Sequence, residues 1–425
     1  MKRHLSLQLP YGTELIEAKL APAVIQGVMT PEAPPMADPA RAITEALAHP
    51  LGAPPLDQIV QEGESVLIVV TDPTRKVPYP EVLPLLLVNL QRVSPGAIEF
   101  LVATGTHRAP DRHLLAAHLG REILDDYRVH IHDCRDSKQL QRLQPSARNT
   151  PVYLNRLLFE FDRVLVVGSI TFHYYAGFTG GPKMVMPGCA GYDTIQHNHS
   201  LVLHPLAGHG KNPNAAPGVL DGNPVYEDNV EISRRANPDF ALDVVLDTHD
   251  RIVGVFAGDP VKAHREGCAF VHTVFNVALD SRADVVIASA GGHPFDETYY
   301  QAHKAFDHAA RALKPGGTLV LVAQLAGGIG SDSFLRWLKY KDLSKLEAEM
   351  RKKYDHVAHI AYCHLQKLEH ANVTLISDLS RPIVEDLGFT PSASVEAAFG
   401  DATSGLFQPT VLIFPHASLT LPRVT

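Results

Sequence analysis

The 425-residue sequence contains only four cysteines. Cys134, Cys189, Cys268 and Cys363 are far apart, and no two of them form a C-x-x-C pair. Such spacing excludes a zinc knuckle and a disulfide framework of the kind found in small secreted domains. We therefore expect reduced thiols and a cytoplasmic location.

Long apolar runs and basic charge are also lacking. No apolar run approaches the roughly 20 residues needed to span a bilayer, and the opening MKRHLSLQLPYG has no apolar core of a signal peptide. The net charge is −8, whereas nucleic acids and anionic membranes require a basic face. The sequence therefore predicts neither as a main partner, although a local basic pocket for a small anion remains compatible with it.

Histidine, by contrast, is abundant, with 23 residues. This abundance favours a metal site or acid–base chemistry, because imidazole titrates near neutral pH and ligates metals. Hydrophobic residues make up 45% and charged residues 20% of the chain, a composition typical of globular proteins. The length predicts two or three domains.

Short apolar runs alternate with longer helical patterns along the chain. The runs are continuous and rich in Val, Ile and Leu, which indicates strands covered on both faces. Alternation of this kind predicts an α/β fold with largely parallel sheets. The predicted strands are Val66–Thr71, Ala97–Ala103, Arg163–Gly168, Phe240–Leu246, Asp284–Ser289, Thr318–Ala323, Val373–Ser377 and Val411–Phe414. The predicted helices include Tyr79–Val93, Tyr299–Leu313 and Ser331–Lys353.

A new strand–loop–helix unit begins at Asp284, so we expect a domain boundary between residues 270 and 283. We predict a cofactor-binding and catalytic α/β domain over residues 1–275. A second α/β domain over residues 276–425 would contribute substrate-binding residues, and its extreme C-terminus could pack back on the first domain. The active site is expected in a cleft between the two domains.

Polar clusters directly follow four of the predicted strands. They read TDPTRKVP, ATGTHR, SITFHYY and SAGGHPFDETYYQAHK. In open α/β sheets, ligands bind outside the carboxyl ends of the strands. Four such clusters at strand ends therefore indicate a functional site more strongly than any one of them alone.

The first two clusters carry Asp72, Thr74, Arg75 and His107. The Asp72 carboxylate could hold ribose hydroxyls, and the Arg75 guanidinium could bind a substrate carboxylate through two hydrogen bonds. The alternative is an Asp–Thr turn with an exposed arginine. His107 could act as a general base, or it could be an ordinary loop histidine that caps the next helix.

The strongest group of residues is His173, Lys183 and His199, around a glycine-rich loop. Lys183 follows Gly180 and Gly181, but it is followed by Met184, so the G-x-x-x-x-G-K-[ST] phosphate loop is absent. A lysine here could bind an anion, act as an amine nucleophile, or simply extend to solvent. His197 would share a face with His199 on an extended segment but not on a helix.

A last cluster places three polar residues at the start of a predicted helix. Gln301 and Lys304 are three positions apart and so share one helix face, beside Tyr300. A helix N-terminus favours an anionic substrate. The alternative is an ordinary amphipathic helix with a solvated lysine.

Taken together, these motifs resemble the nickel-dependent lactate racemase family, whose members use a nickel-pincer nucleotide. The resemblance is carried by TDPTR, TGTHR, FHYYAGFTGGPKMVMPG, the histidine of NHS, and YYQAHK. It implies a racemase or epimerase that inverts C2 of a 2-hydroxy acid by reversible hydride transfer, through a 2-keto acid intermediate. It also implies cofactor-synthesis enzymes as partners.

The resemblance further implies a role for each residue. Lys183 would bind the pyridinium-3-thioamide-5-thiocarboxylic acid mononucleotide covalently, and His199 would be the protein ligand of nickel, with His197 as the alternative. His107 and His173 would be the two acid–base residues. Substrate would be bound by Arg75, Lys304, Gln301 and Tyr300, and the nucleotide by Asp72, Thr74, Gly180 and Gly181.

Several choices stay open at this point. The family acts on several 2-hydroxy acids, so lactate, malate-like, aromatic and sugar acids are all candidate substrates. The same histidines could serve a metal enzyme of another type, and the chain could be a non-catalytic nickel-nucleotide binding protein. The oligomeric state is not predicted.

Overall fold

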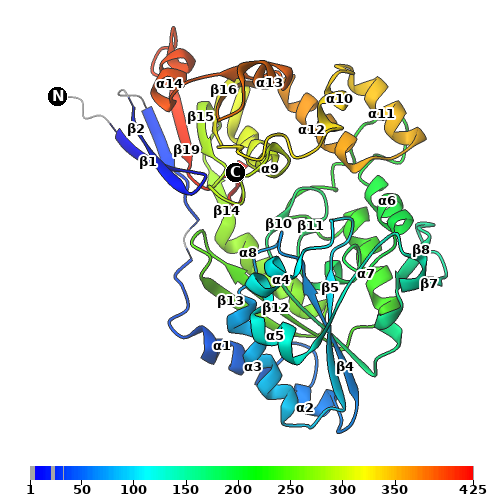
Figure 1. Cartoon of the computed structure of the whole chain (residues 1–425). Helices are drawn as coiled ribbons and strands as arrows, with labels where there is room; N and C mark the ends of the chain where they lie inside the picture. The colour runs from blue at the N-terminus through cyan, green and yellow to red at the C-terminus, as the bar shows by residue number, and fades with distance from the viewer. Residues whose placement is uncertain (1–4, 21–23, 32, 425) are drawn as a thin grey trace. The chain divides into compact units, whose positions relative to one another are not determined.

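The computed structural model describes residues 5–20, 24–31 and 33–424, which form two compact units (Figure 1). The N-terminal unit comprises Ala33–Pro205 and Lys211–Thr273. The C-terminal unit gathers the residues before Ala33, the short segment Leu206–Gly210, and the chain from Val274 onward. The predicted architecture of two α/β units with largely parallel sheets is confirmed.

The N-terminal unit is built on a six-stranded sheet in the order β13-β12-β9-β4-β5-β6. All neighbours pair in parallel except β12 and β13. The sheet strands are β4 (Ser65–Thr71), β5 (Ala97–Ala103), β6 (Arg128–Ile131), β9 (Arg163–Ser169), β12 (Phe240–Leu246) and β13 (Ile252–Gly258). The helices are α1 (Pro39–Ala48), α2 (Leu56–Ile59), α3 (Tyr79–Gln91), α4 (Arg112–Leu119), α5 (Arg121–Asp126), α6 (Tyr192–Ser200), α7 (Pro224–Ala236) and α8 (Lys262–Phe275), which runs past the division between the units.

The strand order reverses between β4 and β9. Counted along the chain, the sheet strands lie in the order 3-2-1-4-5-6, which is that of doubly wound nucleotide-binding sheets. The chain therefore leaves β4 and β9 toward opposite faces of the sheet at their carboxyl ends. Ligands bind at such switch points.

Both faces of this sheet are covered, which explains its continuous apolar strands. In β4, Val66, Ile68 and Val70 pack into one core, and Leu67 and Val69 into the other. The first core is shared with α1, α3 and α4, and Figure 1 shows α1, α2, α3 and α5 gathered on that side of the sheet. The second core is shared with α6, α7 and the loop after β9. A strand buried on both faces cannot show alternating polarity.

The C-terminal unit has its own six-stranded parallel sheet in the order β18-β17-β16-β15-β19-β3. These strands are β3 (Val24–Val28), β15 (Ala283–Ser289), β16 (Leu313–Val322), β17 (Asn372–Ile376), β18 (Thr390–Pro391) and β19 (Thr410–Phe414). The helices are α9 (Tyr299–Ala309), α10 (Phe334–Leu338), α11 (Leu343–Lys352), α12 (His356–Leu368), α13 (Arg381–Asp386) and α14 (Val395–Thr403).

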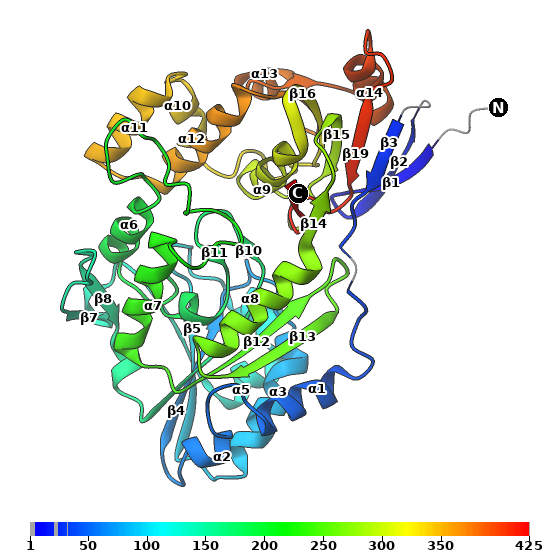
Figure 2. The ribbon, with the colours of Figure 1, turned by 180° about the vertical axis from the view of Figure 1, so that it is seen from behind.

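The start of the chain belongs to this C-terminal unit, which differs from the expected division at residue 275. Strand β3 pairs with β19. The hairpin of β1 (Leu5–Tyr11) and β2 (Glu14–Leu20) buries Leu9 and Leu20 in the same core as β15 and β16. Figures 1 and 2 both show the hairpin beside β19. The last strand, β20 (Leu421–Val424), pairs with β14 (Asn276–Leu279) within this unit.

The segment Leu206–Gly210 joins the C-terminal unit through one buried carboxylate. Glu347 on α11 accepts hydrogen bonds from the backbone N–H groups of Gly208 and Gly210, at 2.9 and 2.8 Å. Arg351 pairs with Glu347 and donates to the carbonyl of Leu206. These bonds explain why the five residues Leu206–Gly210 belong to the C-terminal unit although the N-terminal unit surrounds them in sequence.

All eight predicted strands are present, with boundaries shifted by at most a few residues. The prediction of one helix over Ser331–Lys353 was wrong, because α10 and α11 are separate. Lys341 has a φ of +50°, and the Asp342 side chain accepts from the backbone N–H groups of Ser344 and Lys345 as the N-cap of α11. An aspartate that caps a helix competes with its continuation. Within the described ranges, no helix is long and apolar enough to cross a membrane.

Tyr79, the first residue of α3, ties the ends of two central strands together. Its buried hydroxyl accepts from the N–H of Thr71 at 2.6 Å and donates to the carbonyl of Val167 at 2.8 Å. We expect Tyr79→Phe to lower the free energy of unfolding by about 1–3 kcal/mol, because it leaves buried polar groups unpaired. Urea denaturation followed by circular dichroism measures this, with Tyr153→Phe in the same unit as the control. Equal stability of the two variants would contradict the assignment.

Candidate functional site

Predicted site residues of the N-terminal unit lie in the segments that follow the carboxyl ends of β4, β5 and β9. Asp72, Thr74 and Arg75 follow β4, and His107 follows β5. The chain after β9 supplies His173 and Lys183. Parallel strands end at the same edge of a sheet, so these loops are neighbours in space although they lie far apart in sequence.

Asp72 and His107 form a hydrogen-bonded pair. The His107 Nδ1 lies 2.6 Å from the Asp72 Oδ2, and the Thr74 hydroxyl donates to the other oxygen, Oδ1, at 2.7 Å. Asp72 is only 3% exposed, whereas the side chain of His107 is 38% exposed. Because Nδ1–H donates to the carboxylate, a neutral His107 keeps its Nε2 unprotonated and able to accept a proton.

The charge of Asp72 is stabilised by its neighbours. Burial acts to raise the pKa of its carboxyl group, but the hydrogen bond from His107 and the charges of His107 and Arg75 outweigh burial and lower it. Asp72 is therefore a carboxylate at neutral pH. Both of its oxygens already bond to protein groups, so it holds His107 more directly than it could hold a nucleotide.

A short hairpin after β9 carries His173. Strand β10 (Phe172–His173) pairs with β11 (Gly177–Phe178). The backbone N–H of Ala176 donates to the Nδ1 of His173 at 3.2 Å. A neutral His173 therefore carries its proton on Nε2, the opposite tautomer to that of His107.

Tyr175 lies among three of the predicted site residues. Its ring centroid is 4.5 Å from that of His173 and 5.1 Å from that of His199. The Lys183 Nζ lies 6.0 Å from the centroid of the same ring. One buried tyrosine therefore brings together the predicted acid–base, metal and cofactor residues of this loop region.

The glycine pair before Lys183 sits between two buried side chains. Gly181 donates its N–H to the Asp243 Oδ2 at 3.0 Å, and the His264 Nε2 lies 2.9 Å from the carbonyl of Thr179. A Cβ on Gly180 would lie 2.8 Å from Asp243, and one on Gly181 would lie 2.5 Å from the His264 ring. Both glycines also have positive φ. No other residue type fits this path without strain.

Lys183 is surrounded by protein although part of its side chain is accessible. It lies in the short 3₁₀ helix η3 (Gly181–Met184). Burial, and secondarily the charge of Arg75, lowers its pKa to about 7. Much of the amine is therefore uncharged at neutral pH, and an uncharged amine is nucleophilic.

His199 lies on α6 and is buried, with 8% of the residue exposed and its ring beside Tyr175. Its Nδ1 is 3.0 Å from the Oδ1 of Asn198. His197 lies on the same helix two positions earlier, so the two histidines face different directions. The helix therefore favours His199 over His197 as a ligand beside Lys183.

The remaining predicted residues lie in the C-terminal unit, on α9. Lys304 donates to the Gln301 Oε1 at 2.9 Å, so these side chains share one face as predicted. The N–H groups of Tyr299 and Tyr300 donate to the carbonyls of Gly328 and Ile329. These two backbone groups are therefore already bonded, so an anion near α9 would be bound by side chains rather than by them.

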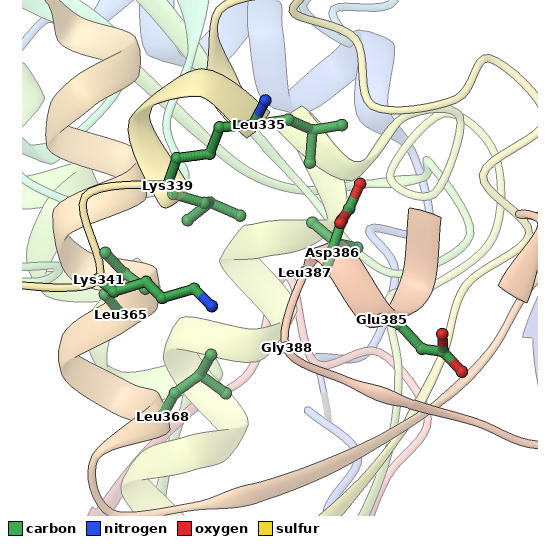
Figure 3. A pocket seen from close by; sticks show the side chains of 10 residues that line it. Leu335, Lys339, Lys341, Leu365, Leu368, Glu385, Asp386, Leu387 and Gly388 are labelled. Atoms are coloured by element: carbon green, nitrogen blue, oxygen red, sulfur yellow. The ribbon is translucent and has the colours of Figure 1, made fainter. Parts of the chain in front are cut away.

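A pocket of about 400 Å³ lies elsewhere in the C-terminal unit (Figure 3). Its floor is leucine-rich, and the side chains of Lys339, Lys341, Glu385 and Asp386 stand around it. None of the predicted site residues lines it. It is therefore a separate feature of the C-terminal unit.

Five further residues support the site and were not predicted from the sequence: Tyr175, Asn198, Asp228, Asp243 and His264. Tyr175 lies inside the glycine-loop motif and could have been included with it. Asp228, Asp243 and His264 lie on distant helices and strands, where no local pattern marks them.

Across the described part of the chain, no group of three or more His, Cys, Asp or Glu side chains is placed to hold a metal ion. The Lys183 Nζ and the His199 ring lie 6.0 and 5.1 Å from the centroid of the same Tyr175 ring. These residues fit a cofactor that joins an amine to a metal.

The depressed pKa of Lys183 has a consequence for stability. The unfolded chain binds a proton at lysine up to about the ordinary value of 10.5, whereas folded Lys183 releases it at about 7. The destabilisation by Lys183 is therefore complete below pH 7 and disappears as the pH rises toward 10.5. We expect Lys183→Met to melt at a higher temperature than the native protein at pH 6, with a smaller difference at pH 9.5.

Thermal melts of the apoprotein across this pH range measure the difference. The exposed Lys138→Met serves as the control, because its melting temperature should stay parallel to that of the native protein. A pH-independent difference for Lys183→Met would argue against a depressed pKa.

Comparisons with known proteins agree with this arrangement. Residues 11–210 match the family described as lactate racemase N-terminal domain, and residues 279–414 match lactate racemase C-terminal domain. The chain is 32% identical over 338 residues to the lactate racemase of Thermoanaerobacterium thermosaccharolyticum, covering 79% of this chain and 78% of that protein. It is also 32% identical to that of Lactiplantibacillus plantarum, over 77% of each chain.

Solved structures show the same relationship. The lactate racemase apoprotein from Thermoanaerobacterium thermosaccharolyticum superposes with a TM-score of 0.91 at 29% identity, covering 99% of this chain and 100% of that one. A Thermotoga maritima protein has a TM-score of 0.67 at 17% identity, covering 91% and 98% of the two chains, and therefore shares the fold.

Proposed function

Because this chain belongs to the lactate racemase family, we propose that it inverts C2 of a 2-hydroxy acid by reversible hydride transfer. The cofactor would be a nickel-pincer nucleotide attached to Lys183. One observation carries the proposal: His173, His199 and Lys183 surround the Tyr175 ring at the switch point of the sheet. The Lys183 amine, whose pKa is lowered to about 7, suits covalent attachment, and His199 would supply a metal ligand.

The proposed cofactor would supply the hydride acceptor and donor when bound. The residues of this chain have three other tasks. Lys183 and the Gly180–Gly181 turn would hold the cofactor, and His199 would ligate its nickel through Nε2. Imidazole is a suitable ligand for square-planar Ni(II).

Proton transfer would fall to His107 and His173. Racemisation needs one residue to remove the hydroxyl proton of one enantiomer and another to return a proton for the opposite enantiomer. The Asp72 bond leaves Nε2 of neutral His107 as a proton acceptor, and the Ala176 bond leaves Nε2–H on neutral His173. We assign Asp72 and Thr74 to positioning His107.

Substrate binding would rely on cations and polar groups. Arg75 lies close enough to Lys183 to affect its charge, and its guanidinium would bind the substrate carboxylate. Tyr300, Gln301 and Lys304 would add contacts from the C-terminal unit. The substrate is a 2-hydroxy acid, and lactate is the first to test because the relatives are lactate racemases.

Covalent loading is the first test. We expect protein co-produced with pincer-synthesis enzymes to gain a nucleotide-sized mass together with nickel, measured by intact mass spectrometry and metal analysis. Lys183→Ala should gain neither. A metal enzyme of another type would instead hold metal without the added mass. A carrier protein would hold both but racemise no 2-hydroxy acid.

The proton-transfer roles make a second prediction. We expect His107→Gln and His173→Gln each to lower the rate of racemisation at least about 100-fold in both directions, the lower range for loss of a general acid or base. Both variants should keep the covalent mass and nickel of the native protein. Polarimetry from each enantiomer measures the rates, and the exposed His113→Gln is the control. Full activity of either variant would remove that residue from the mechanism.

A further inference from the structure

We infer that Asp228, acting through Asn198, orients His199 and selects the tautomer in which Nε2 can bind a metal. This inference rests on the proposed role of His199 as a nickel ligand. Asp228 and Asn198 would be positioning residues, since neither would touch the cofactor. The inference depends on a chain of buried hydrogen bonds between α7 and α6.

Asp228 on α7 is fully buried and accepts three hydrogen bonds. The hydroxyl groups of Ser146 and Thr150 donate at 2.5 and 2.9 Å, and the Asn198 Nδ2 donates at 2.9 Å. All three donors are themselves buried. A hydroxyl group can either donate or accept, so Ser146 and Thr150 could also bond to an amide at position 228. The Asn198 Nδ2 can only donate, so it needs an acceptor oxygen there.

The environment of Asn198 determines which way its amide faces. Its nitrogen lies near two acceptors, the Asp228 carboxylate at 2.9 Å and the Val225 carbonyl at 3.3 Å. The amide oxygen must therefore face His199, whose Nδ1 is 3.0 Å away. An oxygen cannot donate, so the Nδ1 of His199 carries the proton and Nε2 of the neutral ring is left with its lone pair.

This arrangement matches what a metal-binding histidine requires. A histidine ligand commonly donates its second N–H to a protein acceptor, which orients the ring and sets its tautomer, and loss of that partner typically costs 10–100-fold in metal affinity or activity. Here the acceptor is a neutral amide, and a buried carboxylate in turn holds that amide. We call this chain of hydrogen bonds, from Ser146 through Asp228 and Asn198 to His199, the relay.

Asp228→Asn tests the relay with almost no change in shape. Ser146 donates to Oδ1, and its own oxygen already accepts from the N–H groups of Arg148 and Thr150, so the oxygen of the new amide would take the Oδ1 position. The nitrogen of the new amide would take the Oδ2 position, which Thr150 and Asn198 share in the native protein, and would face both of them. The Thr150 hydroxyl can turn and accept from this nitrogen. Asn198 would then have to turn its oxygen toward residue 228 and its nitrogen toward His199. That reversal would place the proton of His199 on Nε2 and remove the metal ligand.

The tautomer can be read in the apoprotein, without cofactor. Long-range ¹H–¹⁵N spectra of ¹⁵N-histidine-labelled protein distinguish the two forms, and the His199 signal is identified by its loss in His199→Gln. We expect Nδ1–H in the native protein and Nε2–H in Asp228→Asn. Asn198→Leu, similar in shape but unable to accept, is the second variant if Asp228→Asn does not fold.

The functional consequence is measured on protein that carries the Lys183 adduct. We expect Asp228→Asn and Asn198→Leu to retain at least about 10-fold less nickel than the native protein after dialysis against a chelator. Glu227→Gln is the matched control, because Glu227 neighbours Asp228 on α7 and also holds this loop, through Arg148, without touching Asn198. It should retain nickel normally.

The outcomes separate this inference from the proposed function. An Nε2–H tautomer in the native apoprotein, or an unchanged tautomer in both variants, would overturn the relay whatever the nickel result. A changed tautomer with normal nickel retention would overturn its role toward the metal. A native protein without adduct would instead count against the proposed function, while the tautomer would still decide whether the relay exists.

Discussion

The hydrogen bond from the backbone of Gly181 to the buried carboxyl group of Asp243 holds the loop on which the candidate site depends. Burial raises the pKa of Asp243 to about 7 and lowers that of His264, on the other side of the glycine pair, to about 4. Neither group is an ordinary surface charge. Asp243 and His264 together restrict the backbone conformation of Gly180 and Gly181. The 3₁₀ helix η3 that follows then sets the direction of the Lys183 side chain.

Much of the fold was predictable because the sheet strands are covered on both faces. Continuous apolar runs such as Val66–Thr71 are seldom compatible with any other element. The pairing of β3 with β19 was not predictable, since the two strands lie almost 400 residues apart and nothing local marks their partnership. The break between α10 and α11 was hidden because the Asp342 cap follows a residue with positive φ, which the helical pattern does not reveal.

In the candidate site, too, residues marked by a local sequence pattern were predicted, whereas residues that depend on contacts with distant parts of the chain were not. His107, His173 and Lys183 were found because each follows a recognisable strand, and parallel strands bring their ends together. The roles of neighbouring residues such as Asp72 and Asn198 could be assigned only from the structure. Asp72 was expected to hold a nucleotide, but its two oxygens bond to His107 and Thr74. Asn198 was invisible in the sequence because its importance depends on the direction of its amide, which Asp228, thirty residues away, determines.

The way the two units divide the chain has a consequence for how the protein is made. The N-terminal unit ends at Thr273, so all of its strands are synthesised before β15, β16, β17 and β19 of the other unit. The C-terminal unit takes β3 from before the N-terminal unit and β19 from after it, so β3 must wait for β19 before its edge is paired. Domains generally fold as units during synthesis. The unit that carries His107, His173, Lys183 and His199 can therefore fold first, while β3 waits for its partner strand β19.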